Sequence, residues 1–473
     1  MTHDRLVLDA VLRNDLACFI AKSFLSVDGS QPYMHNWHID VLADYLLKAY
    51  RRDIKRLVIT LPPRSLKSIS ASVAFIAWAL GQDPSLRFIC ASYSGDLAGK
   101  HGRDSRTIME TPWYKQIFPR TRINPNKSAE YEFETTVGGY RLATSPGGTL
   151  TGRGSGFLII DDAINPRDAM SETKREGVKN WFDGTLYSRL DDKRNDVIIV
   201  IMQRVHVDDL VAHVLAKDGW VQLNLPAIAE TNERFELDDG RVFTREPGDL
   251  LHPEREPVEV LEQAKKNLGT FFFNTQFQQN PVPAEGNLIR WEWFPTFKLH
   301  LGWEEGDRFV HSWDTAIKSG ELNDYSVGTV WLIRNGEMYL LDVIREHLDY
   351  PDLKRRIIEV AKTRRYMADN ILIEDAGSGS SLIQDLRSTA SLHPIAIKPW
   401  ADKVIRMSAE TAQIEAGKVF IPEQAPWLGE FQAEILQFPH GKHDDQVDSM
   451  SQALCWQRER SRRTFRVTDL EGF

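Results

Sequence analysis

The sequence predicts an α/β protein with two domains, each built around its own sheet. In the first half, short apolar runs alternate with segments of helical spacing, which is typical of a parallel sheet buried between helices. A segment punctuated by Pro281, Pro283 and Gly286 then interrupts the pattern. After it, strand signals follow one another as hairpins before helices return. A chain of 473 residues is also longer than one ordinary domain.

The first half is expected to contain four buried strands, three helices and one hairpin. β-branched and other apolar residues fill the strand segments. Gly138-Gly139 supply the positive φ that a tight turn needs. The expected strands are 56–61, 87–92, 157–160 and 196–202, the helices 68–80, 96–110 and 168–190, and the hairpin 130–144.

The second half opens with three strands that pair in antiparallel fashion. Segments 308–313, 326–333 and 337–344 have strand composition, and Asn335-Gly336 is a strong hairpin turn. A helix, strand 371–373, a helix, strand 394–397 and a C-terminal helix follow. This is the order of an RNase H-like fold. The predicted boundaries are a first domain at 1–285, a linker at 286–305, an RNase H-like domain at 306–457 and a basic tail at 458–473.

The composition excludes several classes of protein. Hydrophobic content of 42% and charged content of 26% are those of a globular protein. No apolar run approaches the roughly 20 residues of a membrane span, and the acidic start predicts no secretory signal. The three cysteines have no metal-ligand spacing. With a net charge of −9, any DNA contact must use local basic patches.

A candidate phosphate loop lies between the first strand and the first helix, at 61–68. In such loops, backbone N–H groups face a phosphate, a lysine reaches its oxygens and a hydroxyl ligates magnesium. Lys67 and Ser68 fit these roles, although Leu61 and Leu66 stand at the two usual glycine positions. The alternative is a plain strand, proline turn and helix cap. The candidate nucleotide-binding residues here are Arg64, Ser65, Leu66, Lys67 and Ser68.

Adjacent acids end the strand at 157–160. Asp161 is placed to bind magnesium, and Asp162 to activate the attacking water. Arg153, in a glycine-rich stretch, is a candidate trans-acting finger of an oligomer or else a surface arginine. Trp37 and His38, which begin a helix, are candidates to pack on adenine or else belong to the core.

A second group of acids lies in the last third of the chain. Two-metal nucleases hold their divalent ions between carboxylates, because Mg²⁺ and Mn²⁺ prefer oxygen ligands. Asp314 and Glu374, with Asp375 beside it, follow strands, while Asp445 and Asp448 share one face at the start of a helix. Each acid alone is unremarkable. Together, in an RNase H-like order, they predict a metal centre of Asp314, Glu374, Asp375, Asp445 and Asp448.

Three further residues near these acids are weaker candidates. His443 is considered as a proton shuttle, with a capping or packing role as the alternative. Lys403 and Arg406 are candidates to bind DNA phosphate, with an ordinary solvated helix face as the alternative. Asp444 is expected to point away from the metal centre.

These motifs, in this order, resemble the large terminase subunit of tailed bacteriophages, and the resemblance spans nearly the whole chain. The motifs that carry it are Leu61-Pro62-Pro63-Arg64-Ser65-Leu66-Lys67-Ser68, Thr151-Gly152-Arg153, Leu158-Ile159-Ile160-Asp161-Asp162, Val200–Leu210, Ser312-Trp313-Asp314, Ile373–Gly379 and His443-Asp444-Asp445-Gln446-Val447-Asp448.

The resemblance implies a P-loop ATPase domain of the additional-strand, RecA-like type, followed by an RNase H-like nuclease domain. ATP and Mg²⁺, or Mn²⁺ in the nuclease, are the implied cofactors. Implied partners are double-stranded DNA, a small terminase subunit, the portal protein of the procapsid and further copies of the chain in a ring, in the host cytoplasm and without a membrane. Gln203 and Arg204 match the coupling motif.

This chain departs from the family pattern at two places, and two other functions stay open. The phosphate loop lacks its glycines, and Asp162 stands where many relatives have glutamate. A helicase–nuclease or resolvase-like repair enzyme would use the same two chemistries, but a helicase needs a second RecA-like domain. A non-catalytic DNA-binding assembly factor is the other alternative, against which Lys67, Ser68 and Asp161 argue.

Overall fold

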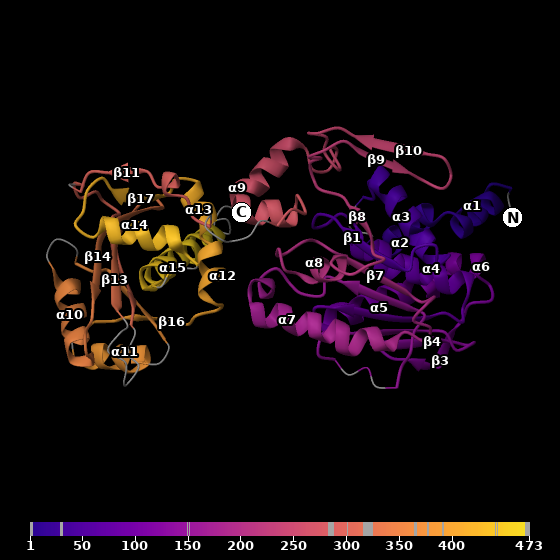
Figure 1. The fold of residues 1–473 in the computed structure, drawn as a ribbon, viewed down its shortest axis with the longest axis horizontal. Helices are drawn as coiled ribbons and strands as arrows, with labels where there is room; N and C mark the ends of the chain where they lie inside the picture. The colour runs from indigo at the N-terminus through magenta and orange to yellow at the C-terminus, as the bar shows by residue number, and fades with distance from the viewer. Residues whose placement is uncertain are drawn as a thin grey trace. The chain divides into compact units, whose positions relative to one another are not determined.

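The computed structural model forms two compact units, which Figure 1 shows as a ribbon. The first comprises Met1–Ala264 and Phe272–Val282, and the second comprises Lys265–Phe271 and Pro283–Phe473. The residues described are 3–28, 32–148, 150, 152–281, 288–299, 301–315, 325–363, 367–375, 378–389, 392–439, 441 and 443–468. Thr151 of the glycine-rich motif, Pro283 and Gly286 of the expected linker, Ala376-Gly377 of the Glu374 motif and the last five residues of the expected tail lie outside them.

The first unit is built on an eight-stranded sheet of order β3-β4-β5-β2-β6-β7-β1-β8. β5, β2, β6, β7, β1 and β8 are parallel, and β3 and β4 add an antiparallel edge. Alternate residues of β1 belong to different cores, Leu57 and Ile59 to one and Val58 to the other, so both faces are covered. The strands are β1 Arg56–Thr60, β2 Arg87–Ser92, β3 Ile123–Ser128, β4 Glu132–Thr135, β5 Tyr140–Thr144, β6 Phe157–Asp161, β7 Val197–Met202 and β8 Val221–Asn224, with a separate hairpin of β9 Glu233–Glu236 and β10 Val242–Arg245.

The position of β7 confirms the additional-strand type of ATPase fold. β7 lies between β1, which leads into the phosphate loop, and β6, which ends in Asp161. The four expected central strands are all present in the described residues.

The helices of the first unit depart from expectation in one region. The long helix expected over 168–190 is instead a series of shorter helices of different types. These are the 3₁₀ helix η2 Asp168–Met170, the α-helix α7 Glu172–Trp181, the π-helix η3 Phe182–Leu186 and the 3₁₀ helix η4 Tyr187–Arg189. The other helices are α1 His3–Asn14, α2 Leu16–Val27, α3 Trp37–Tyr50, η1 Ile69–Ala74, α4 Phe75–Gln82, α5 Gly95–Glu110, α6 Pro112–Ile117, α8 Leu210–Leu215 and α9 Val258–Gln276, whose Lys265–Phe271 stretch groups with the second unit.

The second unit is built on a seven-stranded mixed sheet of order β11-β17-β14-β13-β12-β15-β16. β12, β13 and β14 are antiparallel, as predicted, and β15 runs parallel to β12. Asn335 and Gly336 form the predicted turn with φ of 53° and 85°. The strands are β11 Thr296–Phe297, β12 Arg308–Asp314, β13 Ser326–Arg334, β14 Glu337–Glu346, β15 Asn370–Glu374, β16 Ile395–Ile397 and β17 Val419–Pro422.

Helices and two apolar cores cover this sheet. Trp331 of β13 belongs to one core and the next residue, Leu332, to the other. The helices are η5 Trp291–Trp293, α10 Tyr350–Lys362, α11 Ser378–Thr389, α12 Lys403–Ser408, α13 Thr411–Glu415, α14 Leu428–Gln437 and α15 Asp445–Thr468.

The segment 286–305, expected as a linker, is largely part of the second unit. Leu288, Ile289 and Phe294 are at most 5% exposed and belong to its core. β11 pairs with β17 at the edge of the sheet. The apolar residues of this segment are therefore folded, and the Pro/Gly composition that suggested a linker precedes them. Among the described residues, no helix is long and apolar enough to cross a membrane.

Candidate functional sites

The phosphate loop connects β1 to η1 and adopts left-handed backbone angles without glycine. Arg64 and Leu66 have φ of 60° and 59°, a region that residues with a Cβ disfavour. Leu66 stands at the second usual glycine position, so the bend of the loop is kept although the glycine is not. The half-buried Leu66 side chain packs against the core of the first unit, which helps to hold that conformation.

The loop faces the end of β6. Ser68 Oγ donates a hydrogen bond of 3.0 Å to Asp161 Oδ1. Asp161 is buried, and burial raises the pKa of its carboxyl group, while nearby Lys67 acts in the opposite direction. Among the described residues no hydrogen-bond partner reaches Asp161 Oδ2, and His101 Nδ1 lies 3.6 Å away. Burial lowers the pKa of His101 to about 4, so this ring is neutral near pH 7. A hydroxyl beside a buried carboxylate oxygen of this kind fits a magnesium ion.

Lys67 contacts the next acid. Its Nζ lies 3.1 Å from Asp162 Oδ2, and the backbone N–H of Gln203 donates 3.3 Å to Asp162 Oδ1. Asp162 has φ of 47°, which turns the chain sharply at the end of β6. In this state the lysine that would bind phosphate neutralises the acid that would activate water.

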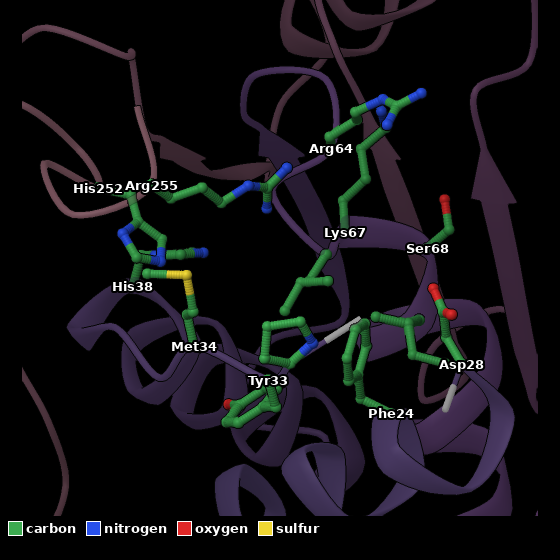
Figure 2. Close-up of a pocket in the computed structure, with 13 residues that line it drawn as sticks. Phe24, Asp28, Tyr33, Met34, His38, Arg64, Lys67, Ser68, His252 and Arg255 are labelled. Atoms are coloured by element: carbon green, nitrogen blue, oxygen red, sulfur yellow. The ribbon is translucent and has the colours of Figure 1, made fainter. Parts of the chain in front are cut away.

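A cavity of about 660 Å³ opens in front of Lys67 and Ser68. Figure 2 shows these two side chains at one end, with His38, Met34 and His252 at the other. The volume suits a small-molecule ligand. Its lining residues are Phe24, Asp28, Pro32, Tyr33, Met34, His38, Arg64, Leu66, Lys67, Ser68, Ile69, His252 and Arg255.

The two residues expected to pack on adenine separate in the structure. Buried His38 lines the cavity, and burial together with nearby His252 lowers its pKa to about 3, so the ring is neutral near pH 7. Trp37 is not among the lining residues. Its ring packs on Phe235 and Phe243, at centroid distances of 5.5 and 5.8 Å. Trp37 therefore anchors the β9–β10 hairpin.

Arg153 and the segment after β7 make defined contacts within the first unit. Arg153 pairs with Glu132 and lies 3.7 Å from Glu134, so these two carboxylates of β4 hold it. The backbone N–H of Arg204 donates 2.8 Å to Gln279 Oε1, and its guanidinium lies 2.9 Å from Asp209. Gln203 thus contacts Asp162 while its neighbour contacts Gln279. Gln279 is a link that the sequence pattern did not reveal, because the two segments are far apart in the chain.

In the second unit, the sheet brings two of the predicted acids to one edge. β12 and β15 are parallel, with Trp313 opposite Ile373, so Asp314 and Glu374 leave the sheet side by side. Asp445 and Asp448 lie in the first turn of α15. Buried hydrogen bonds of 2.8 Å join Ser312 and Ser449 in both directions and fix α15 against β12.

Glu434 is a positioning residue that the sequence analysis missed. Its carboxylate accepts from the backbone and side-chain nitrogens of Gln446 at 2.7 and 2.6 Å, and it is buried. It therefore holds the start of α15, where the acids are. No sequence signal marks it, because the pairing joins α14 to α15 only in the folded chain.

Arg406, a candidate to bind DNA phosphate, lies among these acids in the structure. Its Nη1 donates to Glu374 Oε2 and its Nη2 to Asp448 Oδ1, each at 2.8 Å. The side chain is 11% exposed, so little of it reaches solvent. Lys403, the other expected DNA contact, pairs with Asp444. Both cations of α12 are therefore engaged by acids in this structure.

Asp375 and His443 lie at the margin of the site. Asp375 Oδ1 accepts 2.6 Å from Ser380 Oγ of α11, whereas Glu374 faces Asp448 across Arg406. The His443 ring packs edge-on to Tyr325, with centroids 5.7 Å apart.

The electrostatics of the acid cluster favour a divalent cation. Burial, followed by repulsion from Asp448, Glu374 and Asp445, raises the pKa of Asp314 well above its usual range. Burial also raises the pKa of Asp448 to about 6 despite Arg406. Within the described residues no three His, Cys, Asp or Glu side chains are gathered tightly enough to hold a metal ion. The oxygen donors fit Mg²⁺ or Mn²⁺, but the carboxylates have to move together to bind one.

The sequence of the second unit is similar to a known family of domains. Residues 311–456 match the family model described as the terminase RNase H-like domain. This part of the second unit is similar to terminase RNase H-like domains. The match begins just before Asp314 and ends beyond Asp448, so it covers all the candidate metal ligands of the second unit.

Solved structures show the fold of the longer chain. The large terminase of a thermophilic bacteriophage (crystal form 2) has a TM-score of 0.51 at 12% identity, covering 86% of this chain and 97% of that chain. The HK97 bacteriophage large terminase, at 12% identity, covers 93% and 99% with a TM-score of 0.36. The magnesium-bound large terminase nuclease of thermophilic phage G20c, at 15% identity, covers 37% and 98% with a TM-score of 0.29. No curated protein matches the chain in sequence. The predicted resemblance to large terminases, and a P-loop fold followed by an RNase H-like fold, are confirmed.

Proposed function

We propose that this chain is the large subunit of a phage terminase, which uses ATP to move double-stranded DNA into procapsids and cuts that DNA with a metal-dependent nuclease. The observation that carries the proposal is the presence of two separate candidate centres in one chain. The first contains Lys67, Ser68 and Asp161 in a P-loop fold. The second contains Asp314, Glu374 and Asp448 in the part of the chain that matches the terminase RNase H-like domain.

In the ATPase centre, each residue has a separate task. Lys67 binds the terminal phosphates of ATP, and its ion pair with Asp162 then breaks. The carboxylate of Asp162 is thereby free to orient and deprotonate water. Ser68 and Asp161 would hold the magnesium ion. His38, neutral and buried, forms part of the far end of the cavity, where the base of the nucleotide fits.

In the nuclease centre, Asp314, Glu374, Asp445 and Asp448 would hold divalent ions, with Asp375 beside them. Such ions activate water and stabilise the leaving oxygen of the phosphodiester. The protein's own contribution is the orientation of the carboxylates by β12, β15 and α15, with Ser449 and Glu434 fixing α15. The raised pKa of Asp314 supports this assignment: burial is its main cause, and a cation would relieve the repulsion by neighbouring acids that adds to it.

The proposal extends to the partners. Similar solved structures include large terminases in complex with ADP and with ATP-γ-S, and terminase nucleases with bound magnesium, zinc and cobalt. We assign to this chain double-stranded DNA, a small terminase subunit and a portal protein as partners, a ring of copies during packaging, and the host cytoplasm as its location. Arg153 reaches a neighbouring subunit's nucleotide in that ring once it leaves Glu132.

One pair of variants tests both activities, each serving as the control for the other. Lys67→Ala is expected to abolish ATP hydrolysis and to leave plasmid nicking in Mn²⁺ intact. Asp314→Ala is expected to abolish nicking and to leave ATP hydrolysis intact. Hydrolysis that survives Lys67→Ala would refute the ATPase assignment, and nicking that survives Asp314→Ala would refute the nuclease assignment.

A further inference from the structure

The nuclease centre contains a cation of its own. Arg406 of α12 places one guanidinium nitrogen on Glu374 and another on Asp448, both at 2.8 Å. Its charge also acts on Asp314. Because each nitrogen holds a different carboxylate, the guanidinium bridges the acids from β15 and α15 rather than forming a two-point pair with either one. A bridge of this kind keeps the two carboxylates apart by the width of the group.

These two carboxylates are also among the residues proposed to hold divalent ions. Mg²⁺ binds oxygen at about 2.0–2.1 Å, so two carboxylates that share the ion come closer together than two that share a guanidinium. Arginine stays protonated at any ordinary pH and does not leave by losing its proton. A metal ion that takes both of these carboxylate oxygens would therefore have to displace Arg406 from them. The spread of the acids, too wide among the described residues for a metal ligand set, agrees with this.

We propose that Arg406 is an internal counter-cation of the nuclease centre, and that divalent metal binds by displacing it from Glu374 and Asp448. The proposal rests on the proposed nuclease function and adds a regulatory step to it. With the cation in place the carboxylates are neutralised and held apart, so the centre is kept inactive. Metal and guanidinium compete for two specific oxygens, and the balance between them decides whether the centre is loaded.

The neighbouring residue Lys403 provides a matched control. It belongs to the same short helix and carries the same charge, but it pairs with Asp444, which lies outside the proposed ligand set. Lys403→Gln removes one positive charge near the site without removing the bridge. Arg406→Gln removes the same charge and the bridge together. Any difference between the two variants reports the bridge rather than the net charge.

The experiment measures Mn²⁺ binding to the full-length protein without DNA, by titration calorimetry at low and high salt. Arg406→Gln is expected to bind Mn²⁺ about tenfold more tightly than the wild type, because two charge-assisted hydrogen bonds no longer have to break. Lys403→Gln is expected to change affinity by about threefold or less, and high salt should remove that change. Equal or weaker binding by Arg406→Gln than by Lys403→Gln would overturn the proposal.

The wild-type protein allows a second measurement that does not depend on how the variant folds. Phenylglyoxal modifies accessible arginines, and peptide mapping by mass spectrometry locates them. Mn²⁺ is expected to increase modification of Arg406 and to leave Arg458, which pairs with Glu410 in the same unit, unchanged. Protection of Arg406 by Mn²⁺, or no change, would contradict displacement.

Asp314→Asn separates a failure of this proposal from a failure of the nuclease assignment. If Mn²⁺ binds the wild type and Asp314→Asn alike, the metal centre itself is misassigned. If Asp314→Asn abolishes binding while Arg406→Gln binds no more tightly than the wild type, the metal centre stands and the displacement does not.

Discussion

The left-handed backbone at Leu66 predicts an inverted preference between glycine and alanine. At an ordinary helical position glycine is about 1 kcal/mol less favourable than alanine. At φ of 59° a residue with a Cβ carries a penalty of about 1–2 kcal/mol that glycine avoids. Glycine also loses more conformational entropy on folding, which offsets about 0.5–1 kcal/mol of this advantage over alanine. Leu66→Gly should therefore be more stable than Leu66→Ala by about 0.5–1 kcal/mol.

Both variants lose the leucine side chain, so their difference isolates the backbone. A control pair at Lys100, an exposed position inside α5, should show the opposite order, with glycine about 1 kcal/mol below alanine. Amide hydrogen exchange, followed by mass spectrometry on peptides covering β1 and η1 for Leu66 and α5 for Lys100, gives the local free energy of opening. If alanine is as favourable as glycine at Leu66, or more so, the loop does not have the left-handed bend that we infer.

Three other perturbations have defined outcomes. The pKa of buried His38 is about 3, against about 6.5 in the unfolded chain. With respect to this group, the folded first unit therefore has its full stability above pH 6.5 and loses stability as the pH falls towards 3. By pH 5 the first unit should lose about 2 kcal/mol through this group, and His38→Gln should remove that part of the pH dependence of unfolding. A Cβ at Gly379 would lie 2.0 Å from the carbonyl oxygen of Glu374, so Gly379→Ala should cost the second unit about 2 kcal/mol and weaken Mn²⁺ binding. Gly429→Ala, with nothing within 4 Å, should do neither in the same thermal and calorimetric assays. Trp37→Ala should lower the stability of the first unit by about 2 kcal/mol in urea unfolding, and it should leave affinity for ATP unchanged because the ring packs on the hairpin.

Strand ends were the part of each site that the sequence could predict. Asp161 and Asp314 follow apolar runs, and parallel pairing brings the ends of neighbouring strands to one edge of a sheet. It was harder to predict which side of a helix faces a site. Arg406 has the same pattern in the sequence whether it faces solvent or a buried carboxylate, and its partners lie 32 and 42 residues away. Only tertiary packing distinguishes the two.

The phosphate loop shows a related limit. Leu66 stands where such loops usually have glycine, yet it adopts the left-handed backbone, and its side chain packs against the core of the first unit. Trp37 is a second example. It packs on aromatic residues of β9 and β10, some 200 residues later in the chain, instead of lining the cavity. Local preference was overridden in both cases by contacts distant in sequence.

The hydrogen bond between the backbone of Arg204 and the side chain of Gln279 connects the segment after β7 to the last part of the first unit. The amide of Gln203 touches Asp162, and the amide of the next residue touches Gln279, just before the chain leaves for the second unit at Pro283. Two consecutive backbone N–H groups thus connect Asp162, beside the phosphate loop, with the side chain of Gln279. Asp162 and Gln279 therefore accept hydrogen bonds from consecutive backbone N–H groups, so a change in the position of either residue acts on the same two-residue segment after β7.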